Sequence, residues 1–273
     1  MPRFTTSDDL SLHYTDTGDG LPLLCLAGLT RDGRDFEFVA PHLADLRVIT
    51  LDYRGRGQSD WGDPSTYQIP VEGRDAVELL DHLGIDKAAV LGTSRGGLIA
   101  MLLAATVKNR LLGVALNDIG PEIAPEGLEV IKDYLGRPPV LKTHAEMAAA
   151  RARVLTGFAN VPPERWLREA QILFNETEDG LELTYDPRLR EAVLEGGAQP
   201  APDLWPLFDA LSGLPLACLR GANSDLLSPA TFAEMKRRRP DMVAVEVPDR
   251  GHIPFLDEPQ SLSALKRWLD MLR

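Results

Sequence analysis

The sequence has little cysteine: only Cys25 and Cys218 occur among its 273 residues. Each lies inside a short apolar run typical of a buried strand, so both are expected to be buried free thiols. Two such cysteines do not make a disulfide-stabilised scaffold, and no group of cysteines and histidines has the spacing of a metal site. We therefore expect no metal and no cofactor, and the lack of disulfides favours a cytoplasmic protein.

Basic residues are also in the minority, with 29 lysines and arginines against 41 acidic residues and a net charge of -12 at pH 7. A chain this acidic has no electrostatic reason to bind nucleic acid or an anionic membrane. The dense basic run at residues 236–239 comes at the end of a predicted helix, where positive charge suits the helix dipole. We expect a small-molecule substrate as the partner of a monomer or a homodimer.

Long hydrophobic runs are absent as well. No apolar stretch approaches the roughly 18 residues that a membrane-spanning helix needs, and the N-terminal segment "MPRFTTSDDL" lacks the apolar centre of a signal peptide. Hydrophobic residues nevertheless make up 44% of the chain, which is enough for one sizeable core.

Short apolar runs alternate with helix-like segments over residues 1–120. The segment "VEGRDAVELLDHLG", residues 71–84, is an example of the helical kind, with its apolar residues on one face. Apolar strands that alternate with helices are typical of a parallel sheet covered on both faces. The pattern predicts an α/β fold whose mostly parallel sheet has about eight strands, with helices on both faces.

The alternation stops at residue 121 and resumes at residue 208. Between these points the sequence is helical in character and contains clusters of proline and glycine such as "GRPPV" and "VPPER". We therefore predict one core formed by residues 1–120 and 208–273, with an inserted helical cap over residues 121–207.

The segment "VLGTSRGGL" places Ser94 between glycines, where a predicted strand ends and a helix begins. Residues 92–96 match the pattern G-x-S-x-G, which in a strand–turn–helix context forms a sharp turn that exposes a nucleophilic serine. The hydroxyl then lies at a helix N-terminus, where the helix dipole favours negative charge. Ser94 is the predicted nucleophile.

A serine nucleophile needs a base, and the base needs a carboxylate to orient it. His252 follows the predicted strand "MVAVEV" in a loop, which should lie at the same edge of the sheet as Ser94. Two carboxylates follow other predicted strands, Asp225 and Asp118, and either keeps the chain order serine, aspartate, histidine. We favour Asp225 and retain Asp118 as the alternative acid.

The negative charge on a reacting carbonyl oxygen requires donors that are already in place. The backbone N–H of Arg95, which follows the nucleophile, is one expected donor of this oxyanion hole. The backbone N–H of Leu29, in the loop after the strand "LPLLCLAG", is the other.

With Ser94, Asp225 and His252 in this order, the chain resembles the α/β-hydrolase superfamily, and within it the small, capped, cofactor-free bacterial serine hydrolases. The segment "LDYRGRGQSD" is similar to the family's D-x-R-G-x-G-x-S turn, and "LRGANSDLLSP" and "GHIPFLDEP" resemble its acid and base loops. Some relatives take their acid from after the sixth strand, which keeps Asp118 open. The family usually has His-Gly where this chain has Ala27 and Gly28, so the hydrogen bonding around the oxyanion loop should differ.

The resemblance implies a serine hydrolase that cleaves a small-molecule carboxylic ester, or a related acyl bond, through an acyl-enzyme. Serine at the turn argues against the chemistry of haloalkane dehalogenases and epoxide hydrolases, whose nucleophile is aspartate. Carbon–carbon bond hydrolysis of a diketone, perhydrolysis and a non-catalytic ligand receptor on the same scaffold are the alternatives. The possible substrate contacts are Gly28, Arg31, Arg34, Trp166 and Trp205.

Overall fold

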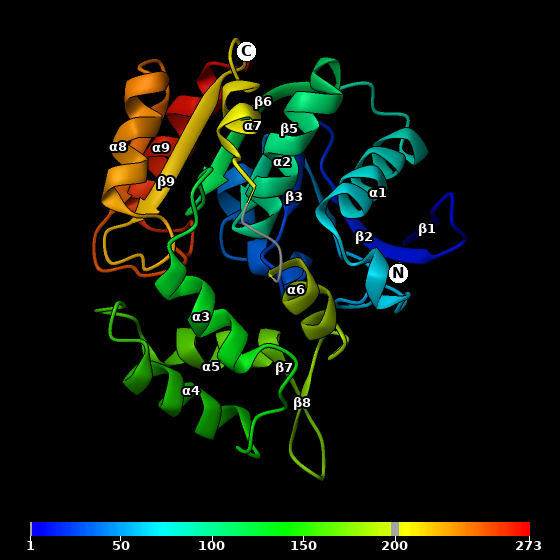
Figure 1. The fold of residues 1–273 in the computed structure, drawn as a ribbon, viewed down its shortest axis with the longest axis vertical. Helices are drawn as coiled ribbons and strands as arrows, with labels where there is room; N and C mark the ends of the chain where they lie inside the picture. The colour runs from blue at the N-terminus through cyan, green and yellow to red at the C-terminus, as the bar shows by residue number, and fades with distance from the viewer. Residues whose placement is uncertain (1, 198–201) are drawn as a thin grey trace.

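The computed structural model describes residues 2–197 and 202–273. Eight strands form its central sheet: β1 (Arg3–Thr5), β2 (Ser11–Thr17), β3 (Leu21–Leu26), β4 (Leu46–Leu51), β5 (Ala88–Thr93), β6 (Leu111–Asn117), β9 (Leu216–Gly221) and β10 (Val243–Val247). Their order is β1-β2-β4-β3-β5-β6-β9-β10, in which β1–β2 and β2–β4 are antiparallel and the other pairs parallel. The predicted α/β fold is confirmed (Figure 1).

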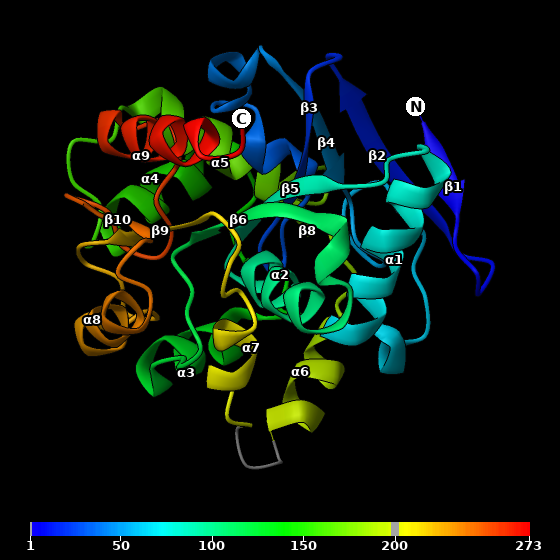
Figure 2. The same ribbon diagram turned by 90° about the horizontal axis from the view of Figure 1, so that it is seen from above.

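Two apolar layers cover the sheet, one on each face. Because side chains alternate along a strand, Leu24 and Leu26 of β3 join one layer, whereas Leu23 and Cys25 join the other. The first layer packs under α1 (Ile69–His82), α2 (Arg95–Thr106), α7 (Trp205–Asp209) and α8 (Pro229–Arg238). The second packs under α9 (Pro259–Asp270) and the short 3₁₀ turns Gly33–Phe36 and Ala40–Leu43. Figure 2 shows α9 on one side of the sheet, with α1, α2, α7 and α8 on the other.

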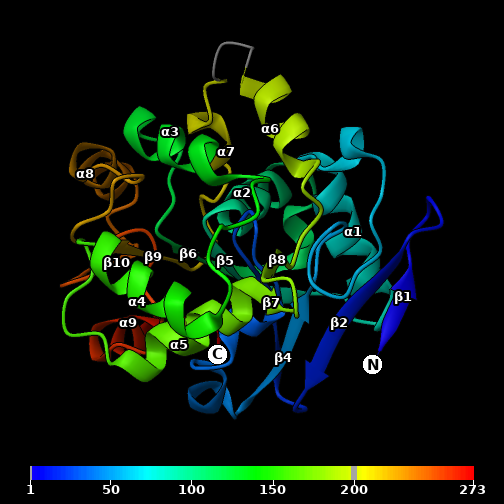
Figure 3. The ribbon, with the colours of Figure 1, turned by 90° about the horizontal axis from the view of Figure 1, so that it is seen from below.

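The chain leaves the sheet after β6 and forms a separate group of elements that we call the insert. These are α3 (Pro125–Tyr134), α4 (His144–Val154), α5 (Pro163–Leu173), β7 (Phe174–Glu176), β8 (Leu181–Leu183) and α6 (Leu189–Gly197). They lie together at one end of the sheet (Figure 1), and α4 and α5 run side by side (Figure 3). Residues 198–201, which belong to the predicted helical segment, lie outside the described residues.

Local sequence explains where the insert's helices begin. Thr143 and Glu146 form a reciprocal capping box at the start of α4, and Pro163 occupies the first position of α5. Trp166 and Ala170 face inward from α5 and pack with Met147 of α4 in the insert's own apolar cluster. The antiparallel hairpin β7–β8 was not predicted, because three-residue strands are too short to show a period of two.

Ion pairs fasten the insert to the core. The pairs are Arg31–Glu169 at 2.8 Å, Arg165–Asp257 at 2.8 Å and Arg168–Glu37 at 2.5 Å. All three insert residues lie on α5, so this helix supplies the insert's side of each pair. Across the described ranges, no helix combines the length and the apolar character needed to cross a bilayer.

Candidate active site

Ser94 occupies the tight turn between β5 and α2, with φ 50° and ψ -114°. This backbone conformation is strained for a residue with a side chain. The flanking glycines are required by space: a Cβ on Gly96 would lie 2.1 Å from the Leu26 carbonyl oxygen, and one on Gly92 would lie 2.5 Å from the Gly96 carbonyl oxygen. The structure thus has the strand–turn–helix geometry that the sequence predicts, with the hydroxyl at the start of α2.

His252 lies between the hydroxyl of Ser94 and a carboxylate. Its Nε2 is 3.0 Å from Ser94 Oγ, and its Nδ1 is 2.7 Å from Asp118 Oδ2. With the proton on Nδ1, the ring donates to the carboxylate and leaves Nε2 free to accept the serine proton. The Asp118 side chain is fully buried, whereas that of His252 is 18% exposed, so the imidazole remains accessible from one side.

Asp118 directly follows β6 and is held by two further donors. Its Oδ1 accepts a hydrogen bond from the Gly221 N–H at 2.8 Å, and its Oδ2 accepts one from the Ser224 hydroxyl at 2.6 Å. The backbone of Asp118 has φ 54°, which turns the chain away from the sheet at this point. The carboxylate is therefore fixed in orientation before any ligand binds.

Asp225, which the sequence analysis favoured as the acid, does not contact His252 in the structure. Its side chain is exposed, and its backbone carbonyl lies against Gly127 of α3. The hydroxyl that points inward from this loop belongs to the preceding residue, Ser224, and it binds Asp118. The structure thus places the alternative candidate, Asp118, beside the imidazole, because Asp118 leaves its strand directly whereas Asp225 comes four residues after β9 ends.

Two backbone N–H groups near Ser94 are unoccupied. Among the residues that the structure describes, neither the N–H of Leu29 nor that of Arg95 has a hydrogen-bond acceptor. Gly28, which precedes Leu29, lies against Ser94, since a Cβ built on it would be 3.9 Å from Ser94 Cβ. The predicted oxyanion donors are therefore free to bind a ligand oxygen.

The loop that carries Leu29 is supported by residues that the sequence analysis did not single out. The Ala27 carbonyl accepts from the Tyr53 hydroxyl at 3.0 Å and from the Gly96 N–H at 3.1 Å. The Leu29 carbonyl accepts from Nε of the buried Arg56 at 3.0 Å. Tyr53 and Arg56 belong to the segment "LDYRGRGQSD", so this turn helps to hold the oxyanion loop where the family's usual histidine is replaced by Ala27.

The guanidinium of Arg95 is directed away from the catalytic residues. Its Nε donates to Glu72 at 2.6 Å and its Nη2 to the Tyr67 carbonyl at 2.9 Å. Only the backbone of Arg95 is therefore available as a donor at the nucleophile.

The other predicted substrate contacts have different surroundings. Arg34 pairs with Asp32 at 2.7 Å and donates to backbone carbonyls at the end of α5, so its role is to join core and insert. Trp205 donates to Glu122 at 2.9 Å and packs beside Phe208 in the first core layer, where it does not contact the catalytic residues.

Trp166 and Arg31 do lie near the catalytic residues. Trp166 packs edge-on against Phe158, and a Cβ on Gly251, the neighbour of His252, would lie 3.0 Å from the Phe158 ring. Arg31 Cγ is 3.3 Å from the Cβ position of Gly28. Its guanidinium pairs with Asp35 at 2.7 Å and with Glu169 at 2.8 Å.

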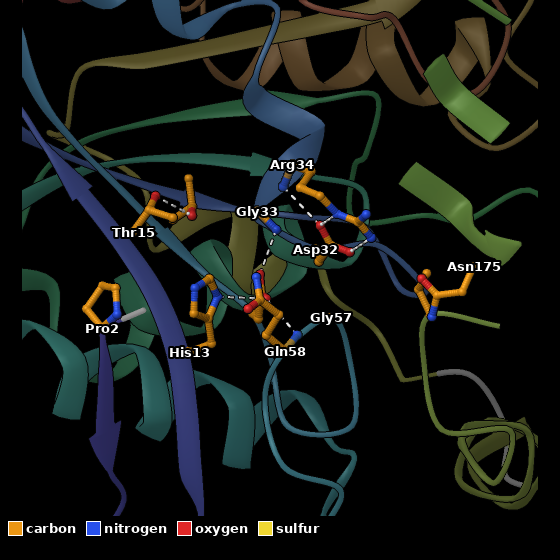
Figure 4. A pocket seen from close by; sticks show the side chains of 12 residues that line it. Pro2, His13, Thr15, Asp32, Gly33, Arg34, Gly57, Gln58 and Asn175 are labelled. Atoms are coloured by element: carbon orange, nitrogen blue, oxygen red, sulfur yellow. Dashed lines mark hydrogen bonds and ion pairs between the residues drawn. The ribbon is translucent and has the colours of Figure 1, made fainter. Parts of the chain in front are cut away.

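A separate cavity of about 450 Å³ lies beside β2 and β4 (Figure 4). His13 Nδ1 lies 2.9 Å from Asp52 Oδ2, and Asp52 also accepts from the Gly33 and Gln58 N–H groups at 2.8 and 3.0 Å. Neither Ser94 nor His252 lines this cavity, and its central polar groups satisfy one another. Within the described ranges, no group of three histidine, cysteine or acidic side chains is arranged to hold a metal ion.

Comparison with known sequences identifies the class of protein to which this fold belongs. The sequence model of the alpha/beta hydrolase family matches residues 23–265, and the chain belongs to that family. It is 41% identical over 261 residues to a 3-hydroxybutyrate-oligomer hydrolase of Cupriavidus necator, which covers 92% of this chain and 89% of that protein.

Two further comparisons agree with this assignment. The chain is 26% identical to the 2-(acetamidomethylene)succinate hydrolase of Mesorhizobium japonicum, over 96% of this chain and 92% of the relative. The crystal structure of an alpha/beta hydrolase from Novosphingobium aromaticivorans superimposes with a TM-score of 0.91 at 42% identity, covering 99% of this chain and 97% of that one. The relatives are thus hydrolases over nearly the whole length of the chain.

Proposed function

We propose that the protein is a serine hydrolase that cleaves a carboxylic ester through an acyl-enzyme. The observation that carries this proposal is the position of His252, with Nε2 at 3.0 Å from Ser94 Oγ and Nδ1 at 2.7 Å from Asp118. Such a series lets an imidazole take the proton of a hydroxyl while a carboxylate stabilises the resulting imidazolium.

The reaction follows from these contacts. Ser94 Oγ attacks the ester carbonyl as His252 Nε2 accepts its proton, and the N–H groups of Leu29 and Arg95 stabilise the negative oxygen. His252 then protonates the departing alcohol, which leaves Ser94 acylated. Water, deprotonated by His252, attacks the acyl group, and the acid leaves as the serine proton returns. One oxyanion donor of this kind is typically worth roughly 2.7–4 kcal/mol in the transition state.

The relative from Cupriavidus necator suggests the substrate class. Its name states that it hydrolyses 3-hydroxybutyrate oligomers, which are esters, and it aligns with 92% of this chain. We infer that short oligomers of a 3-hydroxy acid are substrates here as well. In this role the insert acts as a cap, with Trp166 and Phe158 forming an apolar wall beside the loop of His252.

A fluorophosphonate probe and a 3-hydroxybutyrate dimer test the proposal together. We expect the wild-type protein to be labelled rapidly at Ser94 and to release monomer from the dimer, and Ser94→Ala to lose both properties. Ser65→Ala is the matched control, because Ser65 is hydrogen-bonded only within its own 3₁₀ turn. A wild-type protein that is silent toward the probe and binds the dimer without cleaving it is a receptor, and the proposal is then wrong.

A further inference from the structure

One partly buried guanidinium in the insert has no hydrogen-bond or ion-pair partner among the described residues. Arg151, near the end of α4, has a buried Nε without a hydrogen-bond acceptor, and it makes no ion pair within residues 2–197 and 202–273. The neighbouring arginines at the junction of insert and core differ, since Arg31 and Arg165 each pair with carboxylates. Arg151 is only partly buried as a residue, but its Nε is shielded from water without an acceptor, which costs free energy, so its presence suggests that an anion from outside completes the site.

The unpaired guanidinium lies in the layer that covers the catalytic residues. Its central carbon is 6.0 Å from the centre of the Trp166 ring. Trp166 packs against Phe158 at 5.8 Å between ring centres, and the Phe158 ring is next to Gly251, the neighbour of His252. Arg151 is therefore connected to the catalytic imidazole by a short series of packed side chains.

A second positive charge acts on Arg151 from the core. Burial, followed by the charge of Arg31, lowers the pKa of Arg151 to about 10, and Glu169 only partly opposes this. Arg31 itself packs against Gly28, which is adjacent to Ser94. A negative group placed near both guanidinium groups would relieve their repulsion and supply the missing counter-ion.

A phenol from α3 borders the same region. Tyr134 is 48% exposed; partial burial raises the pKa of its phenol, and the charges of Arg151 and Arg31 oppose that rise. Tyr134 of α3, Arg151 of α4 and Arg31 of the loop after β3 thus influence one another electrostatically.

We propose that Arg151 binds the free carboxylate of the ester substrate, so that the enzyme selects esters of hydroxy acids over neutral esters. This inference rests on the ester hydrolysis proposed above. A hydroxy-acid oligomer carries a carboxylate at one end, and a guanidinium that is planar and lacks a competing partner suits such a group. Arg151 then acts as a specificity residue, and the proton transfers stay with Ser94, His252 and Asp118.

The test compares a 3-hydroxybutyrate dimer that has a free carboxylate with the methyl ester of the same dimer. We expect Arg151→Met to lower kcat/KM for the free acid by about 10- to 100-fold and to leave the neutral ester within about threefold. Arg151→Lys should restore part of the activity toward the acid. Arg153→Met is the matched control, because Arg153 lies two residues away on the same helix and is exposed.

The melting temperature separates a binding role from a structural one. Because Arg151→Met removes a charged group whose buried Nε has no partner, Tm should stay unchanged or rise. A fall in Tm with equal losses on both substrates overturns the inference, as does a wild-type protein that shows no preference for the acid. In either of these two cases, if the wild-type protein still cleaves the esters and is labelled at Ser94, only the inference fails. If neither ester is cleaved and Ser94 stays unlabelled, the proposed function fails, and the inference fails with it.

Discussion

The carboxylate of Asp118 receives hydrogen bonds from three directions, namely from His252, the Gly221 N–H and the Ser224 hydroxyl. Gly221 is the last residue of β9, and Ser224 lies in the loop that follows, which also carries Asp225. The end of β9 and the loop after it therefore orient the Asp118 carboxylate, whereas Asp118 itself directly follows β6. Replacing Asp118 and Asp225 one at a time tests which of the two carboxylates acts on His252.

We expect Asp118→Ala to lower kcat by roughly 10³- to 10⁴-fold, because the imidazole loses the group that orients it and stabilises its charged form. Asp225→Ala should retain activity within about threefold, because its side chain is exposed and does not contact His252. Ester hydrolysis by the two variants, measured beside their melting temperatures, decides between them. The assignment is wrong if Asp225→Ala is the more impaired of the two.

The sequence analysis singled out Ser94 and His252, which the structure brings together, but it favoured Asp225 as the acid and kept Asp118, which contacts His252, only as the alternative. Ser94 belongs to a local motif in which the glycines are demanded by contacts within a few residues. Asp118 and Asp225 both follow strands in the correct order, and nothing local separates them. What decides between them is the course of two loops, in which Asp118 turns inward at φ 54° and Asp225 remains at the surface.

At the scale of elements, the attachment of α5 to the core depends on buried charges. Arg31 bridges Asp35 of the core and Glu169 of α5. Burial raises the pKa of Asp35 to about 6, against the opposing charge of Arg31. Since this value lies above the ordinary aspartate pKa of 3.8, the folded protein holds the proton more tightly than the unfolded chain does.

The stability that Asp35 contributes should therefore decrease as the pH rises from about 4 to about 6. Relative to Asp35→Asn, the free energy of unfolding of the wild-type protein should fall on the order of 2–3 kcal/mol across this range. Denaturant unfolding of both proteins at four pH values from 4 to 7 measures the difference. A difference that does not change with pH contradicts the effect of burial on this carboxyl.

Element prediction succeeded where burial produces a long or continuous pattern. All six residues of β5 and of β9 are buried, which fits the mostly apolar runs "AAVLGT" and "LACLRG" in the sequence. The hairpin β7–β8 was missed because its strands are only three residues long. The ion pairs of α5 could not be foreseen either, because they join residues more than 90 positions apart.

The whole molecule brings together two stretches of chain that the insert separates. Cys25 lies in β3 of the first stretch and Cys218 in β9 of the second, and both thiols are free and buried. Burial raises the pKa of both thiols well above the usual range. Each thiol is therefore protected as long as the sheet is intact.

We expect a thiol reagent at pH 8 to react very slowly with either cysteine in the native protein. In Cys25→Ala and Cys218→Ala, which each retain one thiol, labelling should accelerate over the same range of denaturant, because both strands belong to one cooperative sheet. Labelling rates measured against denaturant concentration test this. If one thiol becomes reactive at clearly lower denaturant, the two stretches unfold separately.

The insert also divides the proton relay along the chain, since Ser94 and Asp118 precede it and His252 follows it. During translation Ser94 and Asp118 are made well before His252. A nascent polypeptide that stops after the insert should therefore have no hydrolase activity. Two polypeptides that carry these parts separately would regain turnover only on reassociation, which makes the fold a natural starting point for a split reporter.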